Sequence, residues 1–311
     1  MTRIGDNTFD CCYGLKDLHI TGKDIIDINT NPFGILNLSK VSLYVSRSTI
    51  EYYKTTSPWN TFGGIFVNEI NLDDDSSEFA YNVDSQLFEI LTYTRTFSHT
   101  NWQALYVPFS MRYDDWKDNF EVANINDVHQ YDDDEDGTID RTDVEVIKLK
   151  EGKSIEPNTP YLIKAKTTGE KIITLEDATL YKTEENTYDV TSWFTRFNFI
   201  GTYHTVTDMA TKGYYAMAEG TLKQATSNAV TLNPFRWYLS VTDRNGNAKP
   251  LNSKSINIVF DDGETTGIEN VNNEAKESSS IHTLTGISKG NDAKTLAPGI
   301  YIKNGKKFIV K

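Results

Sequence analysis

The chain has 311 residues, which exceeds the usual size of a single hydrophobic core, so its length predicts two or three domains. Its 44 acidic and 31 basic residues give a formal net charge of −13. This balance argues against nucleic acid as a partner, because phosphate binding needs a clustered basic surface. The 17 tyrosines and 15 phenylalanines favour a β-rich extracellular module over a buried parallel sheet.

No apolar run in the sequence reaches the length of a membrane-spanning helix, so we expect no membrane span in this chain. The opening residues, MTRIGDNTFDCCYGL, lack the apolar stretch of a signal peptide. We therefore expect either a cytoplasmic protein or a chain that begins partway into a longer one.

Residues 1–70 carry apolar side chains at spaced positions. The first set is Ile4, Phe9, Cys12, Leu15, Leu18 and Ile20, and a weaker copy is Phe33, Leu36, Leu43 and Val45. Such spacing predicts short strand-and-turn coils stacked in a solenoid, where each coil buries its apolar positions against its neighbours.

The two cysteines of the chain, Cys11 and Cys12, are adjacent in this segment. Neighbouring cysteines rarely bridge each other because the geometry is strained, so we expect no structural disulfide. Both fit core positions of a repeat coil, where a buried thiol is an inert packing group.

The stretch RIGDNTFDCCYGLKDLHI resembles one leucine-rich repeat of the type common in Bacteroidetes and treponemal surface antigens, with Thr8 where that family prefers Ala. The stretch VSLYVSRSTIEYYKTTSPWNTFGGI resembles the element that closes such arrays, with Ser46 in place of the usual Pro. The resemblance implies a capped solenoid end in which Trp59 and Phe62 form the plug. It also implies a longer natural protein with further coils upstream.

Residues 71–95 begin with a polar connecting loop and continue into a strand with alternating side chains, QLFEILTYTRTF. Residues 96–262 then show many short strands separated by turn residues. The alternation predicts two sets of side chains that each share one face: Tyr161, Ile163 and Ala165, and Ile256, Ile258 and Phe260. Frequent turns without long helical periods favour an antiparallel, jelly-roll-like β-sandwich.

Five blocks of this segment are similar, in order, to a β-domain found in exported Bacteroidetes proteins. They are RTFSHTNWQALYVPFSM, SIEPNTPYLIKA, FNFIGTYHTV, GYYAMAEGTLKQA and NPFRWYLSV. The resemblance implies export, but it brings no chemistry with it.

The remaining chain divides into a polar linker, 263–280, and a small β tail, 281–311. In the tail, Asn304 and Gly305 between YIK and KKFIV predict a tight hairpin turn. The tail resembles the C-terminal ends of exported Bacteroidetes proteins, including the sorting domains used in type IX secretion.

The sharpest local motif is YDDDEDGTIDRTDVEV, which has the spacing of a calcium-binding loop with Gly137 at the turn. The predicted ligands at loop positions 1, 3, 5, 7, 9 and 12 are Asp132, Asp134, Asp136, Thr138, Asp140 and Asp143. The sequence that follows favours a strand, so the motif is not a complete EF-hand. An Asp at position 12 predicts weak affinity, and a solvated acidic hairpin loop is the alternative.

Exposed aromatic rings could form a sugar-binding platform, and the candidates are Trp102, Trp116, Trp193 and Trp237. Most of them are expected in the core, because strand aromatics usually pack between sheets. Trp116, in the polar run RYDDWKDN, is the one that we expect at the surface as a ligand-binding residue.

The five histidines are scattered without metal-ligand spacing, and the sequence has no nucleophile elbow, phosphate loop or dinucleotide fingerprint. We therefore expect no enzyme and no cofactor other than calcium. The sequence predicts a mainly β, adhesin-like protein of the cell surface or the extracellular space, which binds protein or glycan ligands. The alternative is a carbohydrate-binding module or a vestigial accessory domain of a glycan hydrolase, and a structural stalk is a third interpretation.

Overall fold

The computed structural model describes residues 3–28, 31–249, 251, 255–262, 265–267, 281–283, 299–303 and 306–310. The chain divides into two compact units, Met1–Ile268 and Glu269–Lys311. Strands account for 46% of the structure and helices for 6%, which confirms the predicted mainly β class.

The first sheet consists of three parallel strands: β1 (Asp17–His19), β2 (Ser42–Val45) and β3 (Gly64–Val67). Their register aligns Leu18 with Leu43, and Leu43 with Ile65. The three aligned residues are separated by similar lengths of chain, so each segment places its strand on the strand of the segment before it.

The connections between these strands hold the short helices η1 (Leu38–Lys40), α1 (Ile50–Thr55) and η2 (Trp59–Thr61). Trp59 and Phe62 are both buried, and the ring of Phe33 meets each of them edge-on at 5.5 and 5.3 Å between centroids. Tyr53 lies in the same core, where its hydroxyl accepts a hydrogen bond from the backbone N–H of Ile26 at 2.9 Å. These side chains close one apolar cluster under the three strands.

Cys11 and Cys12 are exposed free thiols, so the prediction that they occupy core positions is wrong. Cys11 lies in a turn and adopts a positive φ of 63°. Among the described residues β1 has β2 as its one neighbouring strand, so this stretch is covered from one side. The nearby Leu15 and Leu18 are accordingly half-buried.

Three larger sheets follow. The first has the order β12 (Gly169–Tyr181), β5 (Ser85–Phe97), β4 (Glu69–Asp73). The second has the order β19 (Thr265–Gly267), β18 (Ser255–Phe260), β9 (Arg141–Lys148), β8 (Phe120–Tyr131), β11 (Tyr161–Ala165), β6 (Gln103–Leu105). The third has the order β13 (Thr187–Ser192), β14 (Thr195–Thr202), β17 (Arg236–Asp243), β15 (Tyr215–Ala218), β16 (Thr221–Gln224).

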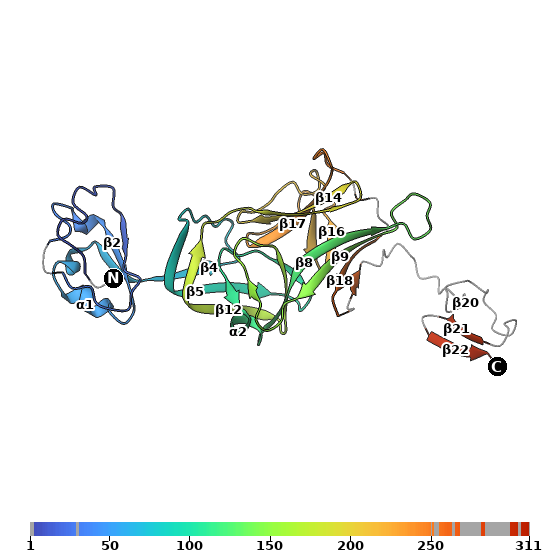
Figure 1. The fold of residues 1–311 in the computed structure, drawn as a ribbon, viewed down its shortest axis with the longest axis horizontal. Helices are drawn as coiled ribbons and strands as arrows, with labels where there is room; N and C mark the ends of the chain where they lie inside the picture. The colour runs from blue at the N-terminus through green and yellow to red at the C-terminus, as the bar shows by residue number, and fades with distance from the viewer. Residues whose placement is uncertain are drawn as a thin grey trace. The chain divides into compact units, whose positions relative to one another are not determined.

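A short pair, β7 (Met111–Arg112) with β10 (Ser154–Ile155), and the helix α2 (Tyr113–Trp116) complete this part of the chain. Figure 1 shows β14 and β17 on one side of the β8–β9–β18 strands, with β4, β5 and β12 gathered separately.

The six-stranded sheet packs on both faces. At β11, Tyr161 and Ile163 enter a core shared with β5 and β12, whereas Leu162 enters a second core shared with β14 and β17. Ile258 and Phe260 of β18 are buried in that second core, with Ile256 packed against it. Both predicted alternations are therefore confirmed, and the sandwich has an additional third layer.

The pairing differs from a purely antiparallel sandwich in two places. Strands β4 and β5 pair in parallel, and so do β9 and β18. Strand β18 follows the whole five-stranded sheet in the chain and then returns beside β9, so no hairpin dictates an antiparallel direction for it. Strands β4 and β5 cover most of residues 71–95, which the sequence predicted as a connecting loop and strand. Both strands contribute side chains to the first hydrophobic core, so this segment is part of the β-domain.

The second unit contains an antiparallel sheet of β20 (Ile281–Thr283), β21 (Gly299–Lys303) and β22 (Lys306–Val310). Lys303 pairs with Lys306, which confirms the predicted hairpin, while the turn residues 304–305 lie outside the described residues. Most of the predicted linker, 263–280, also lies outside them, and the division between the units falls within it. In the described part of the chain, no helix combines the length and the apolarity that crossing a membrane requires.

Candidate functional site

The acidic motif forms the loop that projects between β8 and β9 (Figure 1). Carboxylate oxygens of Asp132, Asp134 and Asp136 lie within 4.8 Å of one another. The Asp132 carboxylate accepts hydrogen bonds from the backbone N–H groups of Asp136 at 3.1 Å and Gly137 at 2.8 Å. The positive φ of Gly137, 86°, permits this tight turn. The structure therefore brings three of the six predicted ligands together.

The other three predicted ligands lie outside this triad. Thr138 donates its backbone N–H to Asp136 at 2.7 Å, and the Asp140 carboxylate accepts the backbone N–H of Asp133 at 2.8 Å. Asp143 belongs to β9 rather than to the loop. Its carboxylate accepts a hydrogen bond from the Asn257 amide at 2.8 Å and forms an ion pair with Arg141 at 3.0 Å. Calcium binding by the loop remains a prediction.

Trp116 is buried, with 2% of its surface exposed, so the prediction that it lies at the surface is wrong. The polar run around it forms the single turn of α2, which is capped by the Asp115 carboxylate accepting the Arg112 backbone N–H at 2.6 Å. One helical turn separates an outer face, with Asp114, from an inner face, where Trp116 meets Tyr113 edge-on at 4.9 Å.

Of the other predicted platform residues, Trp102 and Trp237 are buried in the second core. Trp193 is 60% exposed, at the turn between β13 and β14, where it adopts a positive φ of 53°. Its neighbour Phe194 is also exposed, and the guanidinium of Arg244 lies 4.7 Å from the Phe194 ring centre. One of the four tryptophans is thus placed where a ligand could reach its ring.

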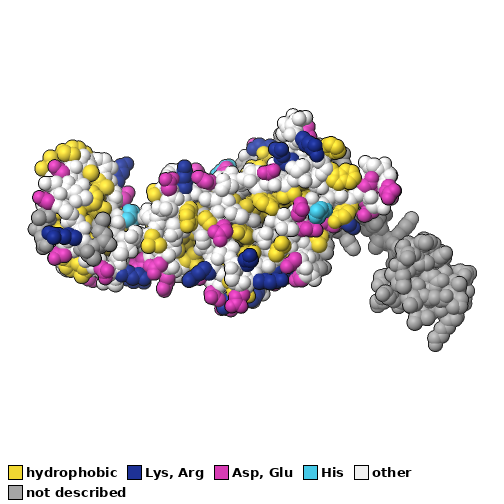
Figure 2. Space-filling view, in the orientation of Figure 1, with side chains coloured by type: hydrophobic (Ala, Val, Ile, Leu, Met, Phe, Trp, Pro, Cys, Tyr) yellow, Lys and Arg dark blue, Asp and Glu magenta, His cyan; other side chains and the backbone are white. Residues whose placement is uncertain are grey.

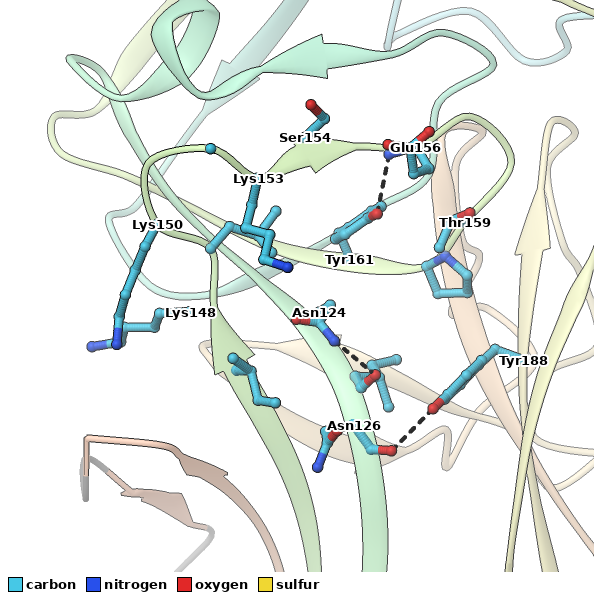
Figure 3. Close-up of a pocket in the computed structure, with 15 residues that line it drawn as sticks. Asn124, Asn126, Lys148, Lys150, Lys153, Ser154, Glu156, Thr159, Tyr161 and Tyr188 are labelled. Atoms are coloured by element: carbon cyan, nitrogen blue, oxygen red, sulfur yellow. Dashed lines mark hydrogen bonds between the residues drawn. The ribbon is translucent and has the colours of Figure 1, made fainter.

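A groove of about 700 Å³ lies where β8, β9 and β11 meet β13. Its lining combines polar and apolar side chains, and Figure 3 labels those that carry polar groups. Its labelled side chains are Asn124, Asn126, Lys148, Lys150, Lys153, Ser154, Glu156, Thr159, Tyr161 and Tyr188. The volume falls within the range of small-molecule sites, about 300–1,000 Å³.

A β-bulge shapes the wall of this groove. The register between β8 and β9 shifts between Ile125 and Asp127, which leaves Asn126 as the extra residue. The Asn126 backbone carbonyl accepts a hydrogen bond from the Tyr188 hydroxyl at 3.0 Å, so the tyrosine of one sheet is fixed against the bulge of the other. The Asn126 side chain is exposed, and Tyr188 keeps 38% of its surface exposed.

The lysines of the groove differ in how they are held. Lys148 forms an ion pair with Asp262 at 2.8 Å, and Lys150 forms one with Asp261 at 3.4 Å. In Figure 3 these two lie together at one edge, whereas Lys153 extends toward the middle of the groove. Lys153 is exposed and supplies a positive charge to that middle.

Burial affects the two tyrosines of the lining. It raises the pKa of Tyr161, whose hydroxyl accepts the backbone N–H of Glu156 at 3.0 Å. It also raises the pKa of Tyr188, with a smaller contribution from the nearby Asp127 charge. Both phenols are therefore protonated at neutral pH and present neutral hydroxyl oxygens.

The comparisons with known proteins identify no relative. No protein-family model matches the sequence, no curated protein resembles it significantly, and no solved structure matches its fold. The groove itself offers amide, hydroxyl and ammonium groups together with the edge of a tyrosine ring. Sequence patterns missed it because its residues come from three separate stretches of chain, 124–126, 147–161 and Tyr188, and the bulge has no sequence signature.

Proposed function

We propose that this protein is a non-catalytic binding protein of the cell surface or the extracellular space, and that the groove at Asn126 and Tyr188 binds a glycan. The observation that carries the proposal is the combination of an exposed tyrosine ring with the exposed amide of Asn126 in a hollow of about 700 Å³. A sugar presents many hydroxyl groups and apolar C–H faces, and these are complementary to amides and an aromatic ring.

The way the groove is held also supports binding. Tyr188 belongs to one sheet and Asn126 to another, and the hydrogen bond between them fixes the ring before a ligand arrives. A binding group that is already ordered loses little conformational freedom when it binds. The ammonium of Lys153 adds one donor that extends into the groove.

The proposal that the protein lies at the cell surface or outside the cell rests on the N-terminal segment. We propose that it is the capped end of a leucine-rich-repeat array, and the in-register parallel strands and the buried Trp59 and Phe62 support this assignment. In the same proposal, the following sheets are a jelly-roll-like domain and the last unit is a tail of the kind found on exported proteins. The acidic loop would hold calcium through its three clustered carboxylates.

The test is binding of the full chain to an array of bacterial and host glycans, followed by affinity measurements on any glycan that binds. Tyr188→Ala and Asn126→Ala should each weaken binding by about tenfold or more, because each removes a polar or aromatic contact from the groove. Tyr13→Ala removes a tyrosine that is more exposed than Tyr188 and lies outside the groove, and it should leave affinity unchanged.

Trp193→Ala tests whether the exposed turn at Trp193, rather than the groove, binds the glycan. If this variant abolishes glycan binding and the two groove variants do not, the exposed turn is the sugar platform and the groove proposal is wrong. If no glycan binds but an extracellular protein does, the proposal that the ligand is a glycan is wrong.

A second candidate is an accessory or vestigial domain of a glycan hydrolase, which is favoured by the exposed carboxylate of Glu156 in the groove. Glycoside hydrolysis ordinarily needs two carboxylates across the scissile bond. Release of reducing sugar by the natural chain, and its loss in Glu156→Gln, would favour this candidate over a binding module.

A further inference from the structure

A buried charge cluster lies at the start of β17, away from the groove. It joins Asp74, which follows β4, with Arg95 of β5 and Arg236 of β17. The Asp74 carboxylate accepts a hydrogen bond from Arg236 at 2.6 Å and forms an ion pair with Arg95 at 3.7 Å. The exposed fractions of the side chains are 2% for Asp74, 1% for Arg95 and 18% for Arg236.

The charges of this cluster do not balance. Two guanidinium groups face one carboxylate, which leaves a surplus of one positive charge out of water. Tyr93 donates its hydroxyl to Asp74 at 2.8 Å, and burial raises its pKa, so it adds no negative charge. Burial, and then the charge of Arg95, lower the pKa of Arg236. A buried charge without its counterion is unfavourable, so the cluster favours an additional anion.

The arginines also have hydrogen-bond donors to spare. Arg95 donates to the Ala104 carbonyl at 3.0 Å and to the Gln103 side chain at 2.9 Å, and its buried Nε has no acceptor in hydrogen-bonding geometry. Arg236 donates to the Pro234 carbonyl and to Asp74. A guanidinium group carries five N–H donors, so each arginine uses two in these bonds.

Both arginines line a cavity of about 250 Å³, together with polar residues such as Thr231 and Asn233. A water molecule takes about 30 Å³ of the liquid, so this space exceeds what a single water fills. The acidic residue in the lining, Glu219, forms an ion pair with Lys223. Its charge is therefore compensated by Lys223.

We propose that this cavity is a second binding site, which takes the carboxylate of a small organic acid between Arg95 and Arg236. The planar guanidinium fork matches a planar carboxylate, and a single negative charge balances the single surplus positive charge. Phosphate fits less well, because near neutral pH it carries more than one charge. The site does not depend on the glycan groove, since the two share no lining residue.

The first test measures thermal unfolding of the full chain with sodium acetate against sodium chloride at the same ionic strength. Acetate should raise the melting temperature with a saturating concentration dependence, and D-glucuronate, a carboxylate on a sugar ring, should do the same, whereas D-glucose should not. Equal effects of acetate and chloride, or an equal effect of inorganic phosphate, would overturn the carboxylate site.

Two substitutions in the cluster should change the acetate response in opposite directions. Arg236→Gln makes the remaining Arg95–Asp74 pair neutral, so acetate affinity should fall by about thirtyfold or more, the loss typical of removing one partner of a buried charged pair. Asp74→Asn raises the surplus to two charges, so the melting-temperature rise with acetate should be larger than in the natural chain. A cluster with a purely structural role would leave the response unchanged in both variants.

Thr231→Trp tests the position of the site without touching the buried charges. Thr231 is exposed at the cavity, so a tryptophan there should block entry and remove the acetate response. Thr207→Trp, a similar change at another exposed threonine, should keep it. If the cluster variants do not fold, a persistent acetate response in Thr231→Trp overturns the proposal by itself. Tyr188→Ala, which alters the glycan groove, should respond to acetate like the natural chain.

Discussion

The groove at Asn126 and the cavity at Arg95 both hold polar groups, but they hold them in different surroundings. In the groove, Lys148 and Lys150 each form an ion pair with an aspartate, so their charges are balanced, and Lys150 also lies close to solvent. In the cavity, the arginines are buried and outnumber their acidic partner. A surplus of charge in buried surroundings, which the groove lysines do not have, therefore decides where electrostatics governs binding and stability in this protein.

Figure 2 shows how charged side chains are distributed over one face of the molecule. Acidic and basic side chains are interspersed over the visible face rather than gathered into one patch of a single sign. On this face the charges therefore form no single-sign patch that would mark a site for a charged partner.

The largest effect is expected from Asp74→Ala, which leaves two buried arginines without their carboxylate. Breaking a buried ion pair by removing one partner costs about 3–5 kcal/mol, so the free energy of unfolding should fall by that amount. Urea unfolding measures it. The matched change Asp114→Ala removes an exposed ion pair with Lys117 and should cost less than about 1 kcal/mol. Equal costs for the two variants would contradict the contrast between buried and exposed charges.

The second largest effect is expected at alkaline pH, where buried tyrosines should ionise only as the protein unfolds. Burial raises the pKa of Tyr93, Tyr106 and Tyr203 above the ordinary value of 10.0, and it raises the pKa of Tyr81 to about 12. A raised pKa in the folded state means that stability is fully present below about pH 10 and is lost as the pH rises further. Circular dichroism and tyrosinate absorbance should therefore show unfolding together with ionisation of the buried class. Complete ionisation before any loss of circular dichroism would contradict this prediction.

Tyr188→Phe should have a smaller effect on stability than either of these changes. The substitution removes the hydroxyl that donates to the Asn126 carbonyl in a partly exposed wall, so the expected cost is about 1 kcal/mol. Urea unfolding gives the value, and Tyr13→Phe is the exposed control. A cost of several kcal/mol would mean that the bulge is held as rigidly as the buried charge cluster.

The smallest effect is expected from calcium. A weak site in the acidic loop should raise stability by about 0.4 kcal/mol at a calcium concentration equal to its Kd, and magnesium should not. Asp134→Asn should abolish the shift. Asp143→Asn should preserve it, because Asp143 pairs with Arg141 and Asn257 outside the triad. A loss of the shift in Asp143→Asn would instead support the full twelve-residue register.

The sequence predicted those features that depend on neighbouring residues. Alternation identified both faces of β11, and the spacing of carboxylates identified Asp132, Asp134 and Asp136 as a cluster. In both cases the geometry of a strand or a turn determines which side chains meet, so a short stretch contains the whole signal.

The features that were missed depend on packing between distant stretches. Asp74 and Arg236 are 162 residues apart, and nothing local marks either as a partner of the other. Trp116 was misplaced because a polar run was interpreted as surface, although one helical turn suffices to direct its single large ring inward. The bulge at Asn126 is likewise set by the pairing of two strands rather than by its own sequence.

The parallel pairing of β9 with β18 has a consequence for biosynthesis. Asn257 is hydrogen-bonded to Asp143, 114 residues earlier in the chain. During synthesis the outer edge of β9 therefore stays uncovered until the ribosome has made these further residues and β18 can pair with it. Until then the strand presents an unpaired edge, and the apolar wall that Ile258 and Phe260 later cover is open to water. A ribosome stalled or a gene truncated before this strand would thus yield a nascent chain prone to aggregation and to capture by chaperones.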